Sequence, residues 1–142
     1  MSKREYPGHP RVGVGAIVIK DDAVLLVKRG ISPAKGMWAI PGGNLKVGET
    51  LQEAVEREIM EETGVRVNAK LPPHFTFKFI ERDEESKIRF HYIIVDLLAD
   101  YVDGEPHGAD DAVDARWVKV TDLDDLPVSQ NTLNVLKSVQ FG

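Results

Sequence analysis

The strongest constraint on the fold is one helix in the middle of the chain whose two ends are marked by their residues. Thr50 and Glu53 have the spacing of a capping box, in which each side chain accepts a hydrogen bond from the other residue's backbone N–H. Gly64 stands where a left-handed residue commonly ends a helix. Together these signals predict a helix from Leu51 to Thr63.

One face of this helix changes from apolar to acidic along its length. At about 100° per residue the same face carries all six of these residues: Leu51, Ala54, Val55, Glu58, Glu61 and Glu62. Unpaired carboxylates are expensive to bury, and at about 5 Å separation each pair repels by roughly 3 kcal/mol at an effective dielectric constant of about 20. Mg²⁺ relieves this repulsion because it accepts carboxylate oxygens and keeps other positions for water and phosphate. The alternative is a solvated acidic helix end.

Two residues beside the acidic face are candidates for supporting it. Arg57 lies one helical turn before Glu61, where it can form an ion pair and orient a ligating carboxylate. Glu49 precedes the helix and can support the ligating carboxylates without binding the metal itself. The alternatives are a surface salt bridge for Arg57 and a favourable charge at the helix N-terminus for Glu49.

The rest of the chain predicts the α/β class, with an α/β/α sandwich built on a mixed β-sheet as its fold. Residues 12–19 and 23–29 are expected to pair as a hairpin, and the loop at 29–49 is long enough to suggest a function. Further strands are expected at 65–67, 74–80, 87–99 and 113–120, and helical segments at 121–126 and 129–141. We expect one domain covering residues 1–142.

Charge and composition exclude several classes of function. The chain has 18 basic and 23 acidic residues and a net charge of −5, so it has no long-range attraction to nucleic acid or anionic lipid. It has no cysteine, which excludes disulfides, thiolate metal sites and thiol nucleophiles. Apolar runs are too short for a membrane span, and no secretory signal is recognisable. We therefore expect a cytoplasmic protein with no membrane or nucleic-acid partner.

The segment GNLKVGETLQEAVEREIMEETGV, which begins at Gly43, resembles the signature motif of the Nudix hydrolases at every defined position. The preceding WAIPGG at 38–43 also resembles that family. The resemblance implies an α/β/α sandwich and hydrolysis of a phosphoanhydride in a nucleoside diphosphate linked to another group, with Mg²⁺ or Mn²⁺ as cofactor. It also implies a small nucleotide substrate and is compatible with a homodimer.

The resemblance also assigns roles to individual residues. Glu58 is implied to bind metal and to activate water, and Gly43 to offer its backbone carbonyl to the metal. The remaining metal ligands are implied to be Glu61 and Glu62, and the supporting residues Arg57 and Glu49.

A second acidic segment, DGEPHGADDAVDARWV at 103–118, resembles the family's loop ahead of the last core strand. Asp110 or Asp111 is therefore the candidate for a further catalytic acid, with Glu105 and His107 as the next choices. The alternative is an acidic surface loop.

Other candidates concern substrate binding. Arg29 ends a strand beside the long loop and is a candidate for phosphate contact, against a plain charge at a strand end. Trp38 is a candidate for stacking on a base, against packing in the core. The aromatic residues that alternate within strands are expected to be mostly core, namely Phe75, Phe77, Tyr92 and Trp117.

For the substrate we favour ADP-ribose or a related nucleoside diphosphate sugar, because GEPHGADDAVDARWV resembles the segment of chains assigned to that group. Ile80 stands where such enzymes often carry proline. The alternative is a nucleoside triphosphate pyrophosphatase that removes oxidised nucleotides of the 8-oxo-dGTP type, with residues 127–131 near the base. A non-catalytic nucleotide-binding module is a further alternative, but the intact motif argues against it.

Overall fold

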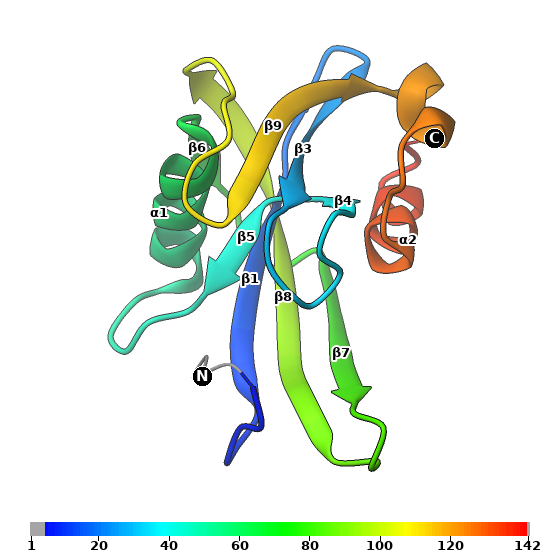
Figure 1. Cartoon of the computed structure of the whole chain (residues 1–142). Coiled ribbons are helices and arrows are strands. Elements are labelled where there is room, and N and C mark those ends of the chain that lie inside the picture. The colour runs from blue at the N-terminus through cyan, green and yellow to red at the C-terminus, as the bar shows by residue number, and fades with distance from the viewer. Residues whose placement is uncertain (1–4, 142) are drawn as a thin grey trace.

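Two β-sheets lie between two helices in the computed structural model, which describes residues 5–141 (Figure 1). Helix α1 (Leu51–Thr63) covers one side and helix α2 (Gln130–Ser138) the other. A short 3-10 helix, η1 (Val120–Asp125), precedes α2. This arrangement confirms the predicted α/β class with helices on both sides of a mixed sheet.

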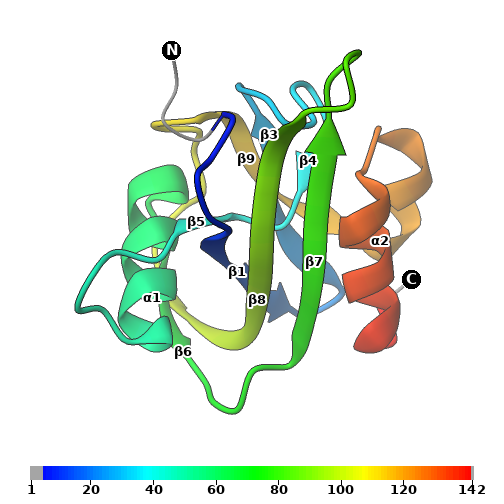
Figure 2. The ribbon, with the colours of Figure 1, turned by 90° about the horizontal axis from the view of Figure 1, so that it is seen from below.

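The larger sheet has five strands and carries most of the site described below. Strands β5 (Gly42–Asn44), β1 (Arg11–Ile17), β8 (Ile88–Asp103) and β6 (Arg66–Ala69) follow one another in that order, and β7 (Phe75–Arg82) also pairs with β8. Strands β1 and β8 are parallel, whereas the other pairs are antiparallel, so the sheet is mixed. Seen from below, Figure 2 shows β1, β8 and β7 between the two helices.

The smaller sheet corrects the predicted hairpin of residues 12–19 and 23–29. It contains β2 (Ile19–Lys20), β3 (Ala23–Arg29), β4 (Trp38–Ala39) and β9 (Ala112–Lys119). Of the predicted first strand at 12–19, only Ile19, in β2, pairs with β3, because β1 belongs to the larger sheet. The chain changes sheets at the fully buried Val18, so one apolar run forms two strands with different partners.

The predicted ends of α1 are confirmed by its hydrogen bonds. Thr50 Oγ1 accepts from Glu53 N at 3.1 Å, and Thr50 N donates to Glu53 Oε1 at 2.9 Å. Gly64 ends the helix in the left-handed conformation, with φ of 75°. Ala54, Val55 and Ile59 are fully buried against the larger sheet. This apolar half of the helix fixes the direction in which its acidic half points.

A second core cluster holds α2 and η1 against the smaller sheet. It includes Val24 and Leu26 of β3, Leu123 of η1 and Leu136 of α2. Within residues 5–141, no helix combines the length and the apolar character that a membrane crossing needs.

Thr50→Ala is expected to lower the free energy of unfolding by about 1 kcal/mol, because it removes one of the two capping-box hydrogen bonds. Urea unfolding followed by circular dichroism measures this loss. Thr121→Ala, at an exposed position of η1, is the control and should change stability little. Equal losses in the two variants would contradict the importance of the cap.

Candidate active site

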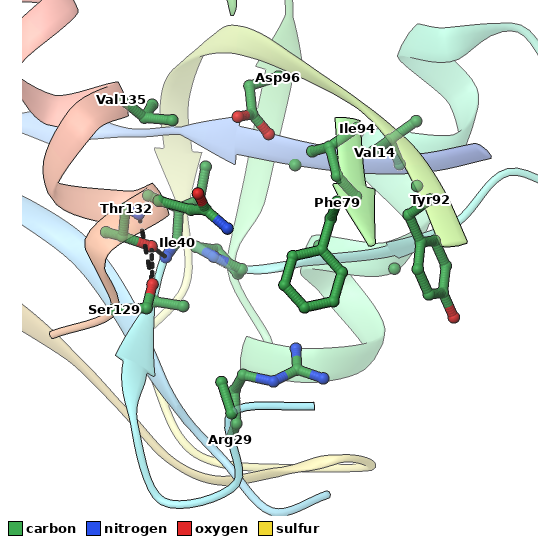
Figure 3. A pocket seen from close by; sticks show the side chains of 18 of the residues that line it. Val14, Arg29, Ile40, Phe79, Tyr92, Ile94, Asp96, Ser129, Thr132 and Val135 are labelled. Atoms are coloured by element: carbon green, nitrogen blue, oxygen red, sulfur yellow. Dashed lines mark hydrogen bonds between the residues drawn. The ribbon is translucent and has the colours of Figure 1, made fainter. Parts of the chain in front are cut away.

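A cavity of about 230 Å³ opens between the larger sheet, the loop after β3 and the start of α2 (Figure 3). Its lining combines an acidic region around the end of α1 with apolar and aromatic side chains of β7 and β8. The acidic residues of the lining are Glu58, Glu62, Asp96 and Asp111. Concave, mostly apolar sites with a few polar groups are typical of small-molecule binding.

Arg57 organises the residues beside this cavity. Its Nε lies 2.6 Å from Glu49 Oε2 and its Nη2 lies 2.9 Å from Glu49 Oε1, which is a bidentate pair. Nη2 also donates to the backbone oxygen of Asn44 at 2.8 Å. Nη1 donates to Glu58 Oε1 at 2.7 Å and lies 3.2 Å from Glu61 Oε2. One guanidinium therefore ties the loop before α1 to β5 and orients the first carboxylate of the acidic face.

Arg57 and Glu49 each stabilise the charged form of the other side chain. The hydrogen bonds from Arg57 lower the pKa of Glu49 to about 2, so that this carboxylate is ionised at neutral pH. The hydrogen bond from Glu49 in turn raises the pKa of Arg57. The structure thus brings Arg57 and Glu49 together beside Glu58, and their supporting role in catalysis stays a prediction.

Two carboxylates of α1 point into the cavity and are largely buried. Glu62 is 8% exposed, and burial raises its pKa to about 7 although Gly42 N donates to its Oε1 at 3.2 Å. The Glu58 side chain is 15% exposed, and burial raises its pKa against the opposing effect of Arg57. The Glu58 carboxylate lies directly against the Gly43 backbone, where any side chain on residue 43 would overlap it. A side chain at residue 43 would therefore displace the Glu58 carboxylate from its position.

The donors of this region fit a hard divalent cation, although the side chains do not form a complete metal centre as they stand. Across residues 5–141, no three His, Cys, Asp or Glu side chains are grouped so as to hold a metal ion. Glu58, Glu62 and Gly43 line the cavity, whereas Glu61 lies outside its lining with 41% of its side chain exposed. Burial raises the pKa values of Glu58 and Glu62, and the opposing effects of Arg57 and Arg29 do not cancel this rise. Carboxylate oxygens in need of positive charge suit Mg²⁺ or Mn²⁺.

The acidic loop after β8 lies against the end of α1. The backbone of the loop is fixed there, because Ala109 N donates to the backbone carbonyl oxygen of Glu62 at 3.1 Å. Asp111 lines the cavity and contributes to the raised pKa of Glu62, while the adjacent, exposed Asp110 contributes to that of Glu58. The next choices, Glu105 and His107, are exposed and do not belong to the lining.

The two predicted substrate contacts have different positions. Arg29 lines the cavity, its Nε donates to the Pro33 oxygen at 2.6 Å, and its charge acts to lower the pKa of Glu62. Trp38 is only 3% exposed, packs in the core beside Val128, and has the Arg116 guanidinium 4.6 Å from its ring centre. Trp38 does not line the cavity. Its position favours the packing interpretation over stacking on a base.

Several lining residues were not recognised as site residues from the sequence, among them Phe77, Phe79 and Asp96. Phe77 and Phe79 are half-buried on the cavity wall, although Phe77 was expected to be mostly core. Asp96 of β8 is 1% exposed and also lines the cavity. A recognisable signal for Asp96 was its position in the apolar run IIVDLL at 93–98, since carboxylates are seldom fully buried.

Comparison with known proteins identifies the family. The model of the NUDIX domain matches residues 9–138. The ADP-ribose pyrophosphatase of Methanocaldococcus jannaschii is 39% identical over 119 residues, covering 84% of this chain and 66% of that relative, or about two thirds of its length. Phosphatase NudJ of Escherichia coli is 33% identical over 117 residues, covering 80% of this chain and 71% of the relative. The crystal structure of a MutT NUDIX hydrolase from Burkholderia pseudomallei is 30% identical, with a TM-score of 0.79, and covers 93% of this chain and 99% of that one.

The chain therefore belongs to the Nudix hydrolases, the family that its motif from Gly43 to Val65 resembles. This assignment confirms the predicted fold and the predicted class of enzyme, a hydrolase acting on phosphoanhydrides.

The buried carboxyl of Asp96 predicts a pH dependence of stability. Burial raises its pKa to about 7, so above the unfolded pKa of about 4 the unfolded state releases this proton first and stability falls as pH rises. The free energy of unfolding of Asp96→Asn minus that of the unmodified protein should be larger at pH 7 than at pH 4 by at least about 1 kcal/mol. The reason is that each pH unit between the two pKa values of Asp96 costs the unmodified protein about 1.4 kcal/mol of stability.

Urea unfolding at both pH values measures this difference. Asp100→Asn is the matched control on the same strand, because Asp100 is exposed. The difference in free energy of unfolding between Asp96→Asn and the unmodified protein should change with pH. If it is the same at both pH values, the Asp96 carboxyl does not titrate as described.

Proposed function

We propose that the protein hydrolyses ADP-ribose, or a closely related nucleoside diphosphate sugar, to a nucleoside monophosphate and a sugar phosphate with the help of Mg²⁺ or Mn²⁺. The observation that carries this proposal is the composition of one cavity. Carboxylates gather at the end formed by α1, and aromatic side chains of β7 and β8 line another part of the same space. Such a cavity suits a ligand that has both a diphosphate and a planar base.

The acidic region supplies the groups that phosphoanhydride hydrolysis requires. Glu58 and Glu62 are the residues of the lining that would hold the cation, with Gly43 contributing its carbonyl and Glu61 available from the same helix. When bound, Mg²⁺ or Mn²⁺ supplies charge neutralisation at the phosphates and a lowered pKa for water. Positioned carboxylates and water suffice for this chemistry without a covalent nucleophile.

Proton transfer is assigned to the carboxylates that face the cavity. Glu58 has a raised pKa, which makes it a better proton acceptor than an ordinary surface glutamate. Arg57 holds one of its oxygens at 2.7 Å and thereby fixes its direction. Asp111, with Asp110 beside it, approaches from the opposite loop and is the candidate for the further acid.

Recognition of the phosphates is assigned to Arg29. Among the described residues that line the cavity it is the only lysine or arginine. Lys28 and Lys35 also flank the loop but are not part of the lining. One arginine together with a cation suits a diphosphate, whereas a triphosphate asks for further positive charge.

The relatives support this choice in part. The archaeal relative at 39% identity is named an ADP-ribose pyrophosphatase, and its alignment includes most of this chain. The MutT NUDIX hydrolase at 30% identity is named without a substrate, so it does not distinguish ADP-ribose from the alternative, an oxidised nucleoside triphosphate. Both activities use the same acidic region and differ in what the rest of the cavity accepts.

Glu62→Gln is expected to reduce turnover at least about 100-fold, as found when a primary charge-stabilising group is removed. The rate of AMP formation from ADP-ribose, measured at increasing Mg²⁺ concentration, gives this loss. The fold should be retained, because a buried carboxylate is replaced by a neutral side chain of the same shape. Glu85→Gln, in an exposed turn, is the control. Near-normal rates of Glu62→Gln at saturating Mg²⁺ would contradict the assigned role.

ADP-ribose is expected to be a better substrate than 8-oxo-dGTP and to yield AMP and ribose 5-phosphate. Polar groups arranged for the second sugar remain unpaired with the wrong substrate, which penalises its transition state. Specificity constants for both compounds, with products identified by mass, measure the preference. A tenfold preference for 8-oxo-dGTP, about 1.4 kcal/mol in transition-state binding, would favour the alternative activity.

A further inference from the structure

A row of four residues crosses the larger sheet along the floor of the cavity. Each of four neighbouring strands contributes one of them, in the order Asn44 of β5, Gly13 of β1, Ile94 of β8 and Phe77 of β7. Directly paired residues face the same side of a sheet, and all four line the cavity. Because neighbouring strands lie about 4.8 Å apart, Asn44 and Phe77 stand at the ends of a floor that is roughly 14 Å wide.

The middle of this row is low and apolar. Gly13 has no side chain, and Ile94 lies over it, since a Cβ added at Gly13 would be 2.8 Å from Ile94 Cδ1. Figure 3 shows Ile94 and Phe79 pointing into the same space. The row therefore offers the Asn44 side chain no polar partner. A ligand ring that rests on Ile94 would lie beside the Asn44 amide.

Asn44 carries a polar group that the fold does not use. Its backbone oxygen accepts from Arg57 Nη2 at 2.8 Å. Within residues 5–141 its side-chain amide makes no hydrogen bond, although Asn44 is half-buried. The amide is nevertheless accessible, because in that part of the chain Asp96 Oδ2 is the only fully buried side-chain nitrogen or oxygen without a partner. An unpaired, accessible amide on the wall of a cavity is available to a ligand.

We propose that the Asn44 amide binds a vicinal pair of ribose hydroxyls of the substrate. This inference rests on the proposed function in requiring a nucleotide that contains ribose, and it adds a residue that determines which sugar the cavity accepts. Asn44 is a specificity-determining residue in this assignment and takes no part in bond cleavage.

The chemistry of the amide fits a diol better than a phosphate. An amide has an oxygen that accepts and an NH₂ group that donates, and each hydroxyl both donates and accepts, so two neighbouring hydroxyls pair with both ends of the amide. Phosphate oxygens only accept, and they carry charge that a neutral amide does not balance. The lining already provides Arg29 and the carboxylates for a cation to serve that need.

The position of Asn44 also agrees with a sugar. Asn44 directly follows Gly43, whose backbone lies against the Glu58 carboxylate, while Phe77 stands at the other end of the row. The amide thus lies between the acidic region and the aromatic wall. In a nucleotide, ribose is the part that joins the phosphates to the base. A ligand with its phosphates at α1 and its base at β7 brings its ribose to this part of the floor.

Two pairs of ligands test the assignment and distinguish the two riboses of ADP-ribose. AMP and 2′,3′-dideoxy-AMP differ in the hydroxyls of the nucleoside ribose. The α,β-methylene analogues of ADP-ribose and ADP resist hydrolysis and differ in the second ribose. Binding of all four is measured by calorimetry at saturating Mg²⁺. The ratio of the two affinities within each pair is the preference for the ligand that has the additional hydroxyls.

Three variants are compared with the unmodified protein. Asn44→Ala removes the amide, whereas Asn44→Asp keeps an acceptor for hydroxyl groups and repels phosphate. Asn68→Ala is the matched control, because Asn68 is an exposed asparagine of β6 in the same sheet and does not line the cavity. Thermal unfolding verifies that each variant is folded. Asn44→Ala should unfold near the temperature of the unmodified protein, since the amide makes no hydrogen bond in the described fold.

In Asn44→Ala we expect the preference to shrink about 3- to 10-fold in one of the two pairs, the range of one neutral hydrogen bond. A change in the AMP pair assigns the amide to the nucleoside ribose, and a change in the analogue pair assigns it to the second ribose. Asn44→Asp should retain the preference, because a carboxylate still accepts from hydroxyls. Asn68→Ala should change neither ratio. Unchanged ratios in Asn44→Ala, including an equal loss of affinity for all four ligands, would overturn the inference.

Failure of the proposed function gives a different result from failure of this inference. A protein whose preference for the diol depends on Asn44 but which does not hydrolyse ADP-ribose would refute the proposed activity and leave the role of Asn44 standing. Hydrolysis of ADP-ribose together with unchanged ratios in Asn44→Ala would do the reverse.

Discussion

The ion-pair network of Arg57 is the interaction on which the rest of the site depends. Its planar guanidinium contacts Glu49 at the end of the long loop, Asn44 at the end of β5, and Glu58 on its own helix. A single side chain thus fixes three segments relative to one another. Lysine has no equivalent, because its ammonium group cannot form the same set of in-plane hydrogen bonds. The position of Glu58 against Gly43 follows from this arrangement.

The apolar core stabilises a helix whose other half is unfavourable by itself. Ala54, Val55 and Ile59 are fully buried, and they hold α1 against the larger sheet. The same orientation places Glu58 and Glu62 in the cavity, where burial raises their pKa values. Part of the free energy gained by core packing is therefore offset by carboxylates kept in a poorly solvated place. Acidic groups with perturbed pKa values in a cavity are typical of catalytic sites.

Local features of the sequence predicted the structure best. The helix from Leu51 to Thr63 has the predicted ends because both caps depend on neighbouring residues alone. The pairing of residues 12–19 with 23–29 was wrong in part, since the partner of a strand depends on segments far away in the chain. The motif predicted Glu58, Glu61 and Glu62 together as metal ligands. Glu58 and Glu62 line the cavity, whereas Glu61 lies outside the lining and pairs with Arg57.

Residues whose surroundings are formed by distant segments of the chain were harder to assign from the sequence. A large aromatic beside a glycine-rich loop suggested a substrate contact, yet Trp38 is covered by the core and by Arg116. Conversely, the sequence marks Asp96 only as a carboxylate within an apolar run, and its position beside Gly15 depends on the pairing of β8 with β1. Register between distant strands is not contained in the local pattern of a single chain.

The two regions of the cavity differ in how firmly they are held. Glu58 and Glu62 belong to a helix fixed by a capping box, the Arg57 network and a buried face. The aromatic wall is provided by β7, which within the described chain forms its strand ladder with β8 alone. A strand attached along one edge tolerates changes in tilt and side-chain size more easily than a central one. Changes of side chain on β7 can therefore alter the shape of the cavity without disturbing the network that holds Glu58 and Glu62.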